Sequence, residues 1–422
     1  MPNIHSRPPI FQRPAQAGLL LPLALTAGLL AARVAAVPPL SDPVGTPLPP
    51  SLHLTYPLPY VLLAPLFTLW DGVSMLSLSR LEGFLWGLLL LYVLWRAARL
   101  LWRGVAWSDR PPVRAPVRRE LKLVATAFGA LLLFVAVGLL WHRPMAALAG
   151  TAPGDVVFDV HSHTNVSHDV KHTLMRGYDT EANLRWHRRA GFGAVFVTDH
   201  NTVAGLRPHA GPPALCPGIE VSAWRSHIVL LGDTVPVARS RYDRSLAGLL
   251  TLLASSDSVY GALSVLSLPE YERNQWGRLD TLLAAGADGL ELLNAAPRAN
   301  ELSRGRRDSV VALARRMNRF VVGASDSHGW GATSMVWNVM PLAVAPAADH
   351  AVCHALLDGL RRGFGSSRIV ERHRLRADSA WPRWLTPVGV VWETWRAMNW
   401  PLTVAWLAWI WLLWGAATRR YT

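Results

Sequence analysis

The chain has 422 residues, enough for two or three domains, and a formal net charge of +14 at pH 7. Hydrophobic residues make up 51% of it and charged residues only 17%, and the apolar residues are concentrated before about residue 145 and after about residue 392. This distribution excludes an ordinary soluble protein and indicates a membrane protein with one soluble insert. Much of the basic excess is arginine between apolar segments, where it acts as a topology signal, so we expect no nucleic acid partner.

Four segments near the N-terminus are candidate membrane spans: 17–36, 54–76, 83–101 and 121–142. A fifth lies at about 398–416 and is rich in tryptophan, which favours the membrane interface. Three prolines interrupt the segment 54–76, so it either spans the bilayer or re-enters it. The sequence therefore predicts three domains. These are a membrane region with three or four transmembrane helices (1–145), a soluble catalytic domain (151–380), and a C-terminal transmembrane helix with a short basic tail (385–422).

Arginine also sets the expected orientation. The loop between the third and fourth segments is strongly basic, and the C-terminal tail contains Arg419 and Arg420. The positive-inside rule places both in the cytoplasm, so the soluble domain is expected on the extracytoplasmic side of a bacterial-type inner or cell membrane. The alternative is a signal peptide cleaved after Ala36, which would put the basic loop outside, against the same rule.

From residue 155 onward, short β-branched runs alternate with amphipathic stretches and turn signals. The seven strand candidates are 156–160, 194–198, 215–221, 227–231, 262–268, 288–293 and 320–324. Such alternation indicates an α/β fold with a mostly parallel sheet. Seven strands in this length suit a β/α barrel flanked by transmembrane helices better than an open sheet, which stays the alternative. The two cysteines, Cys216 and Cys353, are far apart, and we expect two buried thiols rather than one disulfide.

Histidines and carboxylates gather at the ends of these strands. His161 and His163 follow the first strand and, two residues apart in an extended segment, point the same way. Two neutral imidazoles on one face make a metal clamp, and imidazole with carboxylate favours Mn, Zn or Fe over Ca or Mg. Further such residues end or follow other strands: Asp199, His200, Glu220, Asp326 and His328. The carboxyl ends of barrel strands meet at one face, so we expect these groups to converge there.

Five short motifs occur in a fixed order, at 161–163, 198–201, 217–220, 226–232 and 324–328. They begin with a His-x-His pair and end with Ala-Ser-Asp-Ser-His. In this order the motifs resemble the PHP family, named for polymerase and histidinol phosphatase, over about 155–330. The resemblance implies a distorted seven-stranded β/α barrel with a site for two or three metals, which usually hydrolyses phosphate esters.

Carried over position by position, the resemblance implies one metal bound by His161, His163, Glu220 and Asp326. It implies a second metal bound by His200 and His328, together with either His168 or Asp169. Glu220 and His227 would serve a third metal, with Glu220 as the bridge. The family commonly has a His-Pro pair where this chain has Leu268-Pro269, which removes one ligand from the third metal. We therefore expect two divalent ions, and leave open a third that Glu270 would help to bind.

The expected reaction is hydrolysis of a phosphomonoester or phosphodiester by a metal-activated water. The candidate catalytic residues are Asp326, His200, Asp199, Arg176 and Arg225, of which the two arginines would bind phosphate. The partners expected are a phosphate-ester substrate and the lipid bilayer, and protein partners are not predicted. The alternative is a degenerate PHP-like domain that binds metal or ligand as an extracytoplasmic sensor or scaffold, motivated by Leu268.

Overall fold

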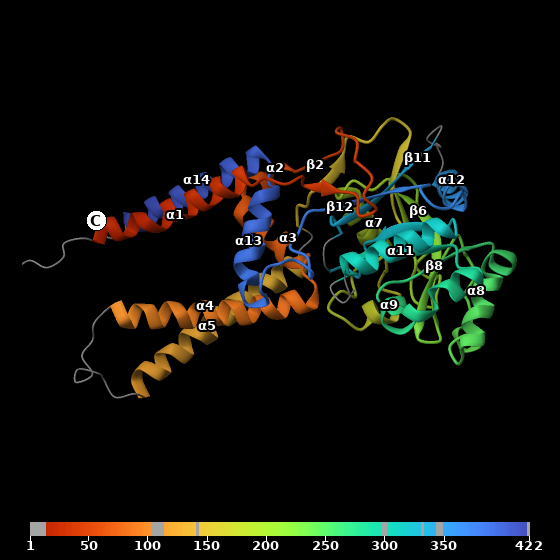
Figure 1. Cartoon of the computed structure of the whole chain (residues 1–422), viewed down its shortest axis with the longest axis horizontal. Coiled ribbons are helices and arrows are strands. Elements are labelled where there is room, and N and C mark those ends of the chain that lie inside the picture. The colour runs from red at the N-terminus through yellow and green to blue at the C-terminus, as the bar shows by residue number, and fades with distance from the viewer. Residues whose placement is uncertain are drawn as a thin grey trace, which may run out of the picture.

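A computed structural model of the chain describes residues 14–102, 114–140, 143–296, 302–330, 333–342 and 349–419. These residues form a globular part around a large sheet and a group of helices that extend from one side of it (Figure 1). A small two-stranded sheet pairs β2 (His53–Thr55) with β3 (Ala147–Ala149), and four of these helices lie between the two strands in the sequence.

The large sheet contains the seven predicted strands and three more. In hydrogen-bonded order its strands are β1 (Leu40–Ser41), β12 (Arg368–Arg372), β11 (Val336–Pro341), β4 (Asp155–Asp159), β5 (Ala194–Val197), β6 (Ala214–Ala223), β7 (Ser226–Leu231), β8 (Leu263–Leu266), β9 (Gly289–Asn294) and β10 (Phe320–Ala324). The three strands that the sequence did not predict, β1, β11 and β12, extend the sheet beyond β4.

The predicted seven-stranded β/α barrel is wrong, because the sheet is a curled, ten-stranded sheet of mixed direction. Strands β4, β5 and β6 run parallel, as do β8, β9 and β10, but β7 is antiparallel to both of its neighbours. Only Trp224 and Arg225 separate β6 from β7. A connection this short makes a hairpin, whereas parallel neighbours need a long crossover. Arg225 has φ of 59°, the left-handed conformation that tight hairpin turns require.

Strands β10 and β11 approach each other without a backbone ladder between them. The side chain of Asn338 on β11 takes the place of one: its Oδ1 accepts a hydrogen bond from the backbone N–H of Gly323 at 2.8 Å. The Nδ2 of Asn338 donates to the carbonyl oxygen of Gly323 at 2.7 Å. The side chain of Asn338 therefore hydrogen-bonds β10 to β11.

Helices cover the sheet between successive strands. They are α6 (His168–Lys171), α7 (Thr180–Arg189), α8 (Leu246–Tyr260), α9 (Glu270–Asn274), α10 (Leu279–Ala284), α11 (Arg304–Arg316) and α12 (Asp349–Arg361). The cap of α7 is Asp179, whose carboxylate accepts a hydrogen bond from the N–H of Ala182. The side chains of Phe158, Phe196 and Phe320, each at most 2% exposed, form part of the core between the sheet and α12.

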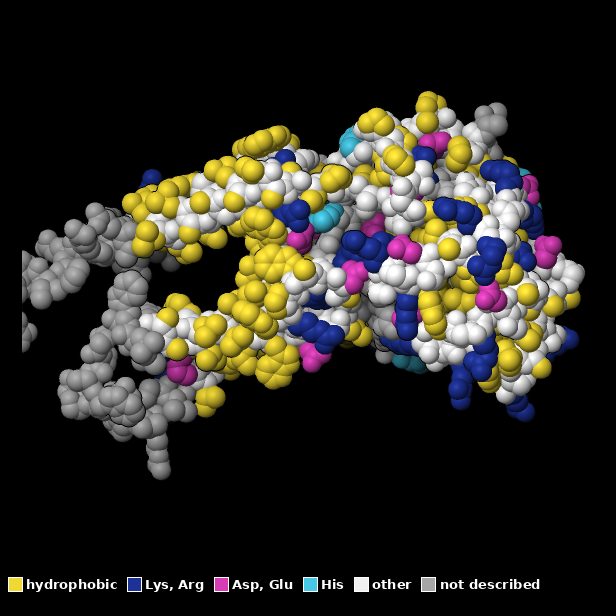
Figure 2. All heavy atoms as spheres, in the orientation of Figure 1, with side chains coloured by type: hydrophobic (Ala, Val, Ile, Leu, Met, Phe, Trp, Pro, Cys, Tyr) yellow, Lys and Arg dark blue, Asp and Glu magenta, His cyan; other side chains and the backbone are white. Residues whose placement is uncertain are grey.

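The extending helices contain most of the apolar ends of the chain. They are α1 (Pro14–Val34), α2 (Leu58–Leu62), α3 (Ala64–Ser74), α4 (Leu78–Trp102), α5 (Arg114–Leu140), α13 (Thr386–Ala397) and α14 (Trp400–Thr418). Figure 2 shows hydrophobic side chains gathered on these helices, whereas charged side chains are spread over the globular part. The segment 54–76, predicted as a span or re-entrant loop, contains two short helices, α2 and α3.

Two of the described helices are long and apolar enough to cross a membrane, judged by length and composition: Leu78–Ala98 and Trp400–Thr418. Gly18–Val34 is apolar but shorter. Among the described residues, therefore, one helix in the N-terminal region qualifies, rather than the three or four that were predicted. Part of the predicted fourth segment, 141–142, lies outside the described residues.

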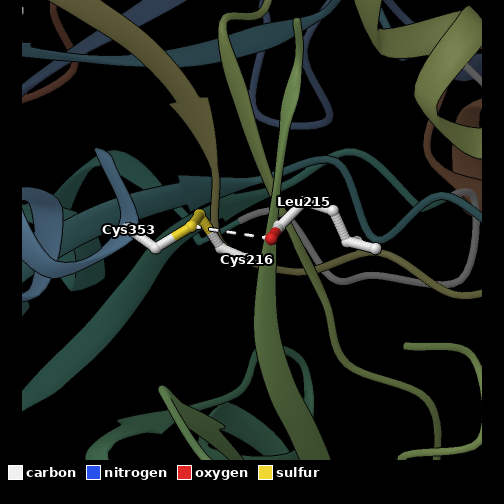
Figure 3. Close-up of a disulfide and its surroundings, with 3 residues drawn as sticks. All are labelled: Leu215, Cys216 and Cys353. Atoms are coloured by element: carbon white, nitrogen blue, oxygen red, sulfur yellow. Dashed lines mark hydrogen bonds between the residues drawn. A yellow bond between two sulfur atoms is a disulfide. The ribbon is translucent and has the colours of Figure 1, made fainter. Parts of the chain in front are cut away.

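The two cysteines form a disulfide, contrary to the expectation of two thiols. Cys216 on β6 is bonded to Cys353 on α12, and the sulfur of Cys353 lies 3.6 Å from the carbonyl oxygen of Leu215 (Figure 3). The bond closes a sequence separation of 137 residues, which the sequence could not pair because spacing alone does not bring two distant cysteines together. It fixes α12 to the middle of the sheet.

Candidate metal centre

The first and last motifs lie next to each other at the ends of β4 and β10. The N–H of His163 donates to the carbonyl oxygen of Ser327 at 2.9 Å, and the N–H of Asp326 donates to that of His161 at 2.8 Å. This short parallel pairing continues the extended segment, so the imidazoles of His161 and His163 emerge on one side of it, as their spacing predicts. A second isolated bridge pairs His200 with Glu220.

Glu220 lies at the centre of these groups. Its Oε2 is 3.1 Å from Nε2 of His161, 3.3 Å from Nε2 of His163 and 3.2 Å from Nε2 of His200. Despite these distances, Oε2 of Glu220 is buried and makes no hydrogen bond to any described residue. Nε2 of His161 is also 3.1 Å from Nε2 of His163. Imidazole and carboxylate groups that converge at these distances are the arrangement that surrounds a cation.

Three overlapping groups of side chains are suited to hold a metal ion, with ligand atoms within 4.8 Å of one another in each group. The groups are His161, His163 and Asp326; His163, Asp169, His200 and His328; and His200, Glu220 and His227. His163 is shared by the first two groups and His200 by the last two. Nearly all of the ligands expected from the sequence therefore come together in one continuous cluster.

For the second metal, the sequence left either His168 or Asp169 as a ligand beside His200 and His328. The structure places Asp169 in the cluster. Its Oδ2 lies 2.5 Å from Nε2 of His328 and 3.4 Å from Nε2 of His200. The ring of His168 packs against the ring of His200 instead, with 4.8 Å between their centroids. His168 lines the cavity beside the cluster and belongs to none of the three groups.

The third group contains the most exposed ligand of the cluster, His227. Nδ1 of His227 is 3.1 Å from Oε1 of Glu220 and 3.8 Å from Oε1 of Glu270. Leu268, at the position where the resemblance to the PHP family would place a histidine, is 1% exposed, and its side chain packs in the core. Glu270 is therefore placed to take part in this group, and the side chain of Leu268 is not.

Burial and neighbouring charges set the protonation of the cluster. Burial, reinforced by neighbouring His328, lowers the pKa of His163 to about 4, so its imidazole is neutral at pH 7. Burial would raise the pKa of Asp326, but His161 and His328 outweigh it and keep that pKa below its usual value. Neutral imidazoles beside ionised carboxylates are the forms that bind metal.

The candidate catalytic residues are placed in different ways. Asp326 and His200 belong to the cluster. Asp199 turns away from it: its carboxylate accepts hydrogen bonds from the backbone N–H of Thr164 at 2.6 Å and from its hydroxyl at 2.7 Å. Burial raises the pKa of Asp199 to about 6. Arg176 is exposed and does not line the cavity, whereas Arg225 does.

A cavity of about 450 Å³ opens beside the His227 group. Trp224 and Arg225 from the β6–β7 turn line it, with Arg239 and Asn274. The guanidinium of Arg225 lies 5.7 Å from the centre of the Trp224 ring, and Nδ2 of Asn274 donates to the carbonyl oxygen of Arg225 at 2.8 Å. These contacts fix the turn at the mouth of the cavity.

Sequence reasoning missed two sets of polar residues behind the cluster. Asp159 binds both His187, at 3.0 Å, and the backbone N–H of Ser325, also at 3.0 Å, and so joins the segments that bear the first and last motifs. Glu291 on β9 is fully buried and lies 2.6 Å from Nδ1 of His161. The one signal for Glu291 was a carboxylate inside an apolar strand, which requires a buried partner.

Comparison with known proteins gives little beyond this geometry. No family model matches the chain, and no curated protein sequence matches it. A structure described as a "putative metal-dependent phosphoesterase" from Bifidobacterium adolescentis is similar at 18% identity and a TM-score of 0.30, over 43% of this chain and 90% of that one. PsfC from Pseudomonas syringae is similar at 18% identity and a TM-score of 0.36, over 57% and 96%. At these TM-scores neither likeness assigns a function to this chain.

Proposed function

We propose that this chain is a membrane-anchored hydrolase that cleaves a phosphomonoester or phosphodiester with the help of divalent metal ions. The observation that carries the proposal is the position of Glu220, whose Oε2 faces three imidazole nitrogens at 3.1 to 3.3 Å without a hydrogen bond among the described residues. Three contiguous ligand groups around this carboxylate suit a site with more than one metal.

The donor set fits Mn, Zn or Fe. Imidazole and carboxylate together suit these ions, whereas Ca and Mg prefer sites made only of oxygen ligands. When bound, such ions lower the pKa of a coordinated water and neutralise phosphoryl oxygens. Asp326 and His200 would orient the water, because both sit in ligand groups and face the centre of the cluster.

The cavity beside the cluster would receive the ester. The guanidinium of Arg225 offers paired donors for a phosphate oxygen, and the exposed turn that bears it is fixed by Asn274. Trp224 presents an apolar wall for the alcohol part of the substrate. Arg176, which was expected to share this role, is left out of the proposed mechanism because it is exposed outside the cavity.

Several features support membrane anchoring with the globular part outside the cytoplasm. The helices Leu78–Ala98 and Trp400–Thr418 extend from the same side of the globular part, and the C-terminus lies at their far end (Figure 1). Basic residues follow both helices in the sequence, which the positive-inside rule places in the cytoplasm. The Cys216–Cys353 disulfide fits an oxidising compartment, where such bonds persist.

The test uses the full chain, purified in detergent and stripped of metal. We expect added Mn²⁺ to bind and to switch on hydrolysis of p-nitrophenyl phosphate or bis-p-nitrophenyl phosphate. The variant His163→Ala removes a side chain shared by two ligand groups and should lose both metal and activity. His354→Ala, on the exposed face of α12, is the matched control and should keep both. Metal binding in the wild type without turnover of either ester would contradict the hydrolase and favour a metal-binding sensor or scaffold.

A further inference from the structure

Glu291 is a buried carboxylate beside the ligand cluster to which no role has yet been given. It is 0% exposed, and its Oε1 accepts a hydrogen bond from Nδ1 of His161 at 2.6 Å. Its Oε2 accepts from the backbone N–H of Leu268 at 2.9 Å and from Nδ2 of Asn294 at 3.0 Å. Both carboxylate oxygens are thus occupied by protein donors, so Glu291 acts on the cluster through its neighbours.

The contact with Glu291 decides which nitrogen of His161 is free to bind a metal. Because Nδ1 donates its proton to Glu291, Nε2 is the nitrogen left to give its lone pair to a metal. Nε2 is the atom that faces the cluster, 3.1 Å from Oε2 of Glu220. A histidine that binds a metal through one nitrogen is generally held by a carboxylate or carbonyl at the other, which fixes its tautomer and ring orientation.

Asn294 extends this arrangement to a second ligand. It lies on the same strand as Glu291 and is 6% exposed. Its Nδ2 is 3.0 Å from Oε2 of Glu291 and 3.2 Å from Oδ2 of Asp326. One amide therefore joins the carboxylate that holds His161 to the carboxylate of Asp326, while Oδ1 of Asp326 is left facing Nε2 of His163 at 3.1 Å.

We propose that Glu291 and Asn294 are positioning residues for the group formed by His161, His163 and Asp326. Glu291 fixes the Nδ1–H tautomer of His161, and Asn294 holds Asp326 with one oxygen turned toward the cluster. Leu268 takes part through its backbone N–H, so an apolar side chain at that position does not disturb the arrangement. The inference rests on the metal site of the proposed function, but not on the reaction assigned to it.

The test compares Mn²⁺ binding by the metal-free full chain in detergent, measured from the electron paramagnetic resonance signal of free Mn²⁺. Glu291→Gln should weaken binding at one class of site by roughly 10- to 100-fold and leave the other sites unchanged. Asn294→Ala should weaken the same class of site by less. The matched control is Glu371→Gln, which removes another buried carboxylate, paired with Arg374 and Arg376, and should bind Mn²⁺ as the wild type does.

A second readout follows the histidine itself. With ring-¹⁵N-labelled histidine, the protein loaded with diamagnetic Zn²⁺ should show His161 with Nδ1–H in a strong hydrogen bond and Nε2 on the metal, and Glu291→Gln should lose that Nδ1–H signal. Unchanged Mn²⁺ affinity in Glu291→Gln, or an equal loss in Glu371→Gln, would overturn the proposal. If Glu291→Gln does not fold, Asn294→Ala decides, and unchanged affinity there overturns it.

Failure of this inference and failure of the proposed function give different results. A wild type that binds Mn²⁺ but hydrolyses no ester contradicts the hydrolase, while the affinities of the variants still decide the role of Glu291. A wild type that hydrolyses esters, with Glu291→Gln binding Mn²⁺ equally well, contradicts only the positioning role. A wild type that binds no Mn²⁺ contradicts both.

Discussion

Two clusters of buried charged side chains in this protein differ in how their carboxylate oxygens are paired. Around Glu220, imidazoles and carboxylates crowd together, and one carboxylate oxygen has no hydrogen bond among the described residues. Between α3 and the sheet, Asp71 is 2% exposed and both of its oxygens are paired. Its Oδ1 lies 3.2 Å from Arg143, and its Oδ2 accepts hydrogen bonds from Arg372 and Tyr60, each at 2.7 Å.

The difference separates a structural cluster from a binding one. At Asp71 the two guanidinium groups of Arg143 and Arg372 more than balance the charge of one carboxylate, and they donate to both of its oxygens. The cluster therefore connects the helices to β12 without needing a ligand. At Glu220 imidazole and carboxylate groups converge, one carboxylate oxygen has no hydrogen bond among the described residues, and a cation is what would satisfy it. We therefore expect mutations in the first cluster to change stability and mutations in the second to change metal binding.

The largest effect is expected from Asp71→Asn. It leaves two buried arginines without a counter-charge, and arginine cannot lose its proton, so the free energy of unfolding should fall by about 3–5 kcal/mol. Denaturant unfolding measures this, with Asp280→Asn as the control. Asp280 pairs with Arg316 in an exposed ion pair, whose loss should cost at most about 1 kcal/mol. Folded Asp71→Asn should bind metal normally, and a specific loss of metal affinity would break the distinction between the clusters.

Glu220→Gln should show the reverse pattern. It removes the carboxylate common to all three imidazole contacts, so metal affinity should fall by more than about 100-fold, beyond the loss typical of an outer positioning residue. In the metal-free protein its cost in unfolding free energy should be smaller than that of Asp71→Asn, because histidines left without a partner can become neutral. Equal destabilisation by the two substitutions, with metal binding intact, would mean that both clusters are structural.

Metal affinity should rise with pH between 7 and 9. Burial lowers the pKa of His227, but Glu220 outweighs it and raises that pKa to about 9 in the metal-free protein. For His328, burial is likewise outweighed by Asp326 and Asp169, and the pKa is again about 9. A metal binds the neutral ring, so below pH 9 it must displace these protons, and affinity should change by about tenfold per pH unit for each proton released. Titration calorimetry in buffers of different ionisation enthalpy counts the protons, and a pH-independent affinity would contradict this assignment.

Sequence reasoning reached the site more fully than the fold. The motifs could be found because strand ends converge whatever the direction of other strands, and His161 and His163 share a face by spacing alone. The mixed sheet was missed although the five residues between the predicted strands 215–221 and 227–231 are too few for the crossover that parallel neighbours need. The pairings of β1, β11 and β12 and of Cys216 with Cys353 depend on contacts between distant segments, which no local pattern records. Glu291 was hidden because only its neighbour His161 explains a carboxylate inside that strand.

The central claim, that the Glu220 cluster is a metal centre, is tested most directly by X-ray absorption at the metal edge of the full chain loaded with Mn or Zn. We predict ligands at about 2.0–2.2 Å that include several imidazoles, seen from the outer-ring scattering, together with carboxylate oxygen. The imidazole signal should fall in His163→Ala and remain in His354→Ala. A spectrum made only of oxygen ligands, or no metal retained after dialysis, would contradict the account.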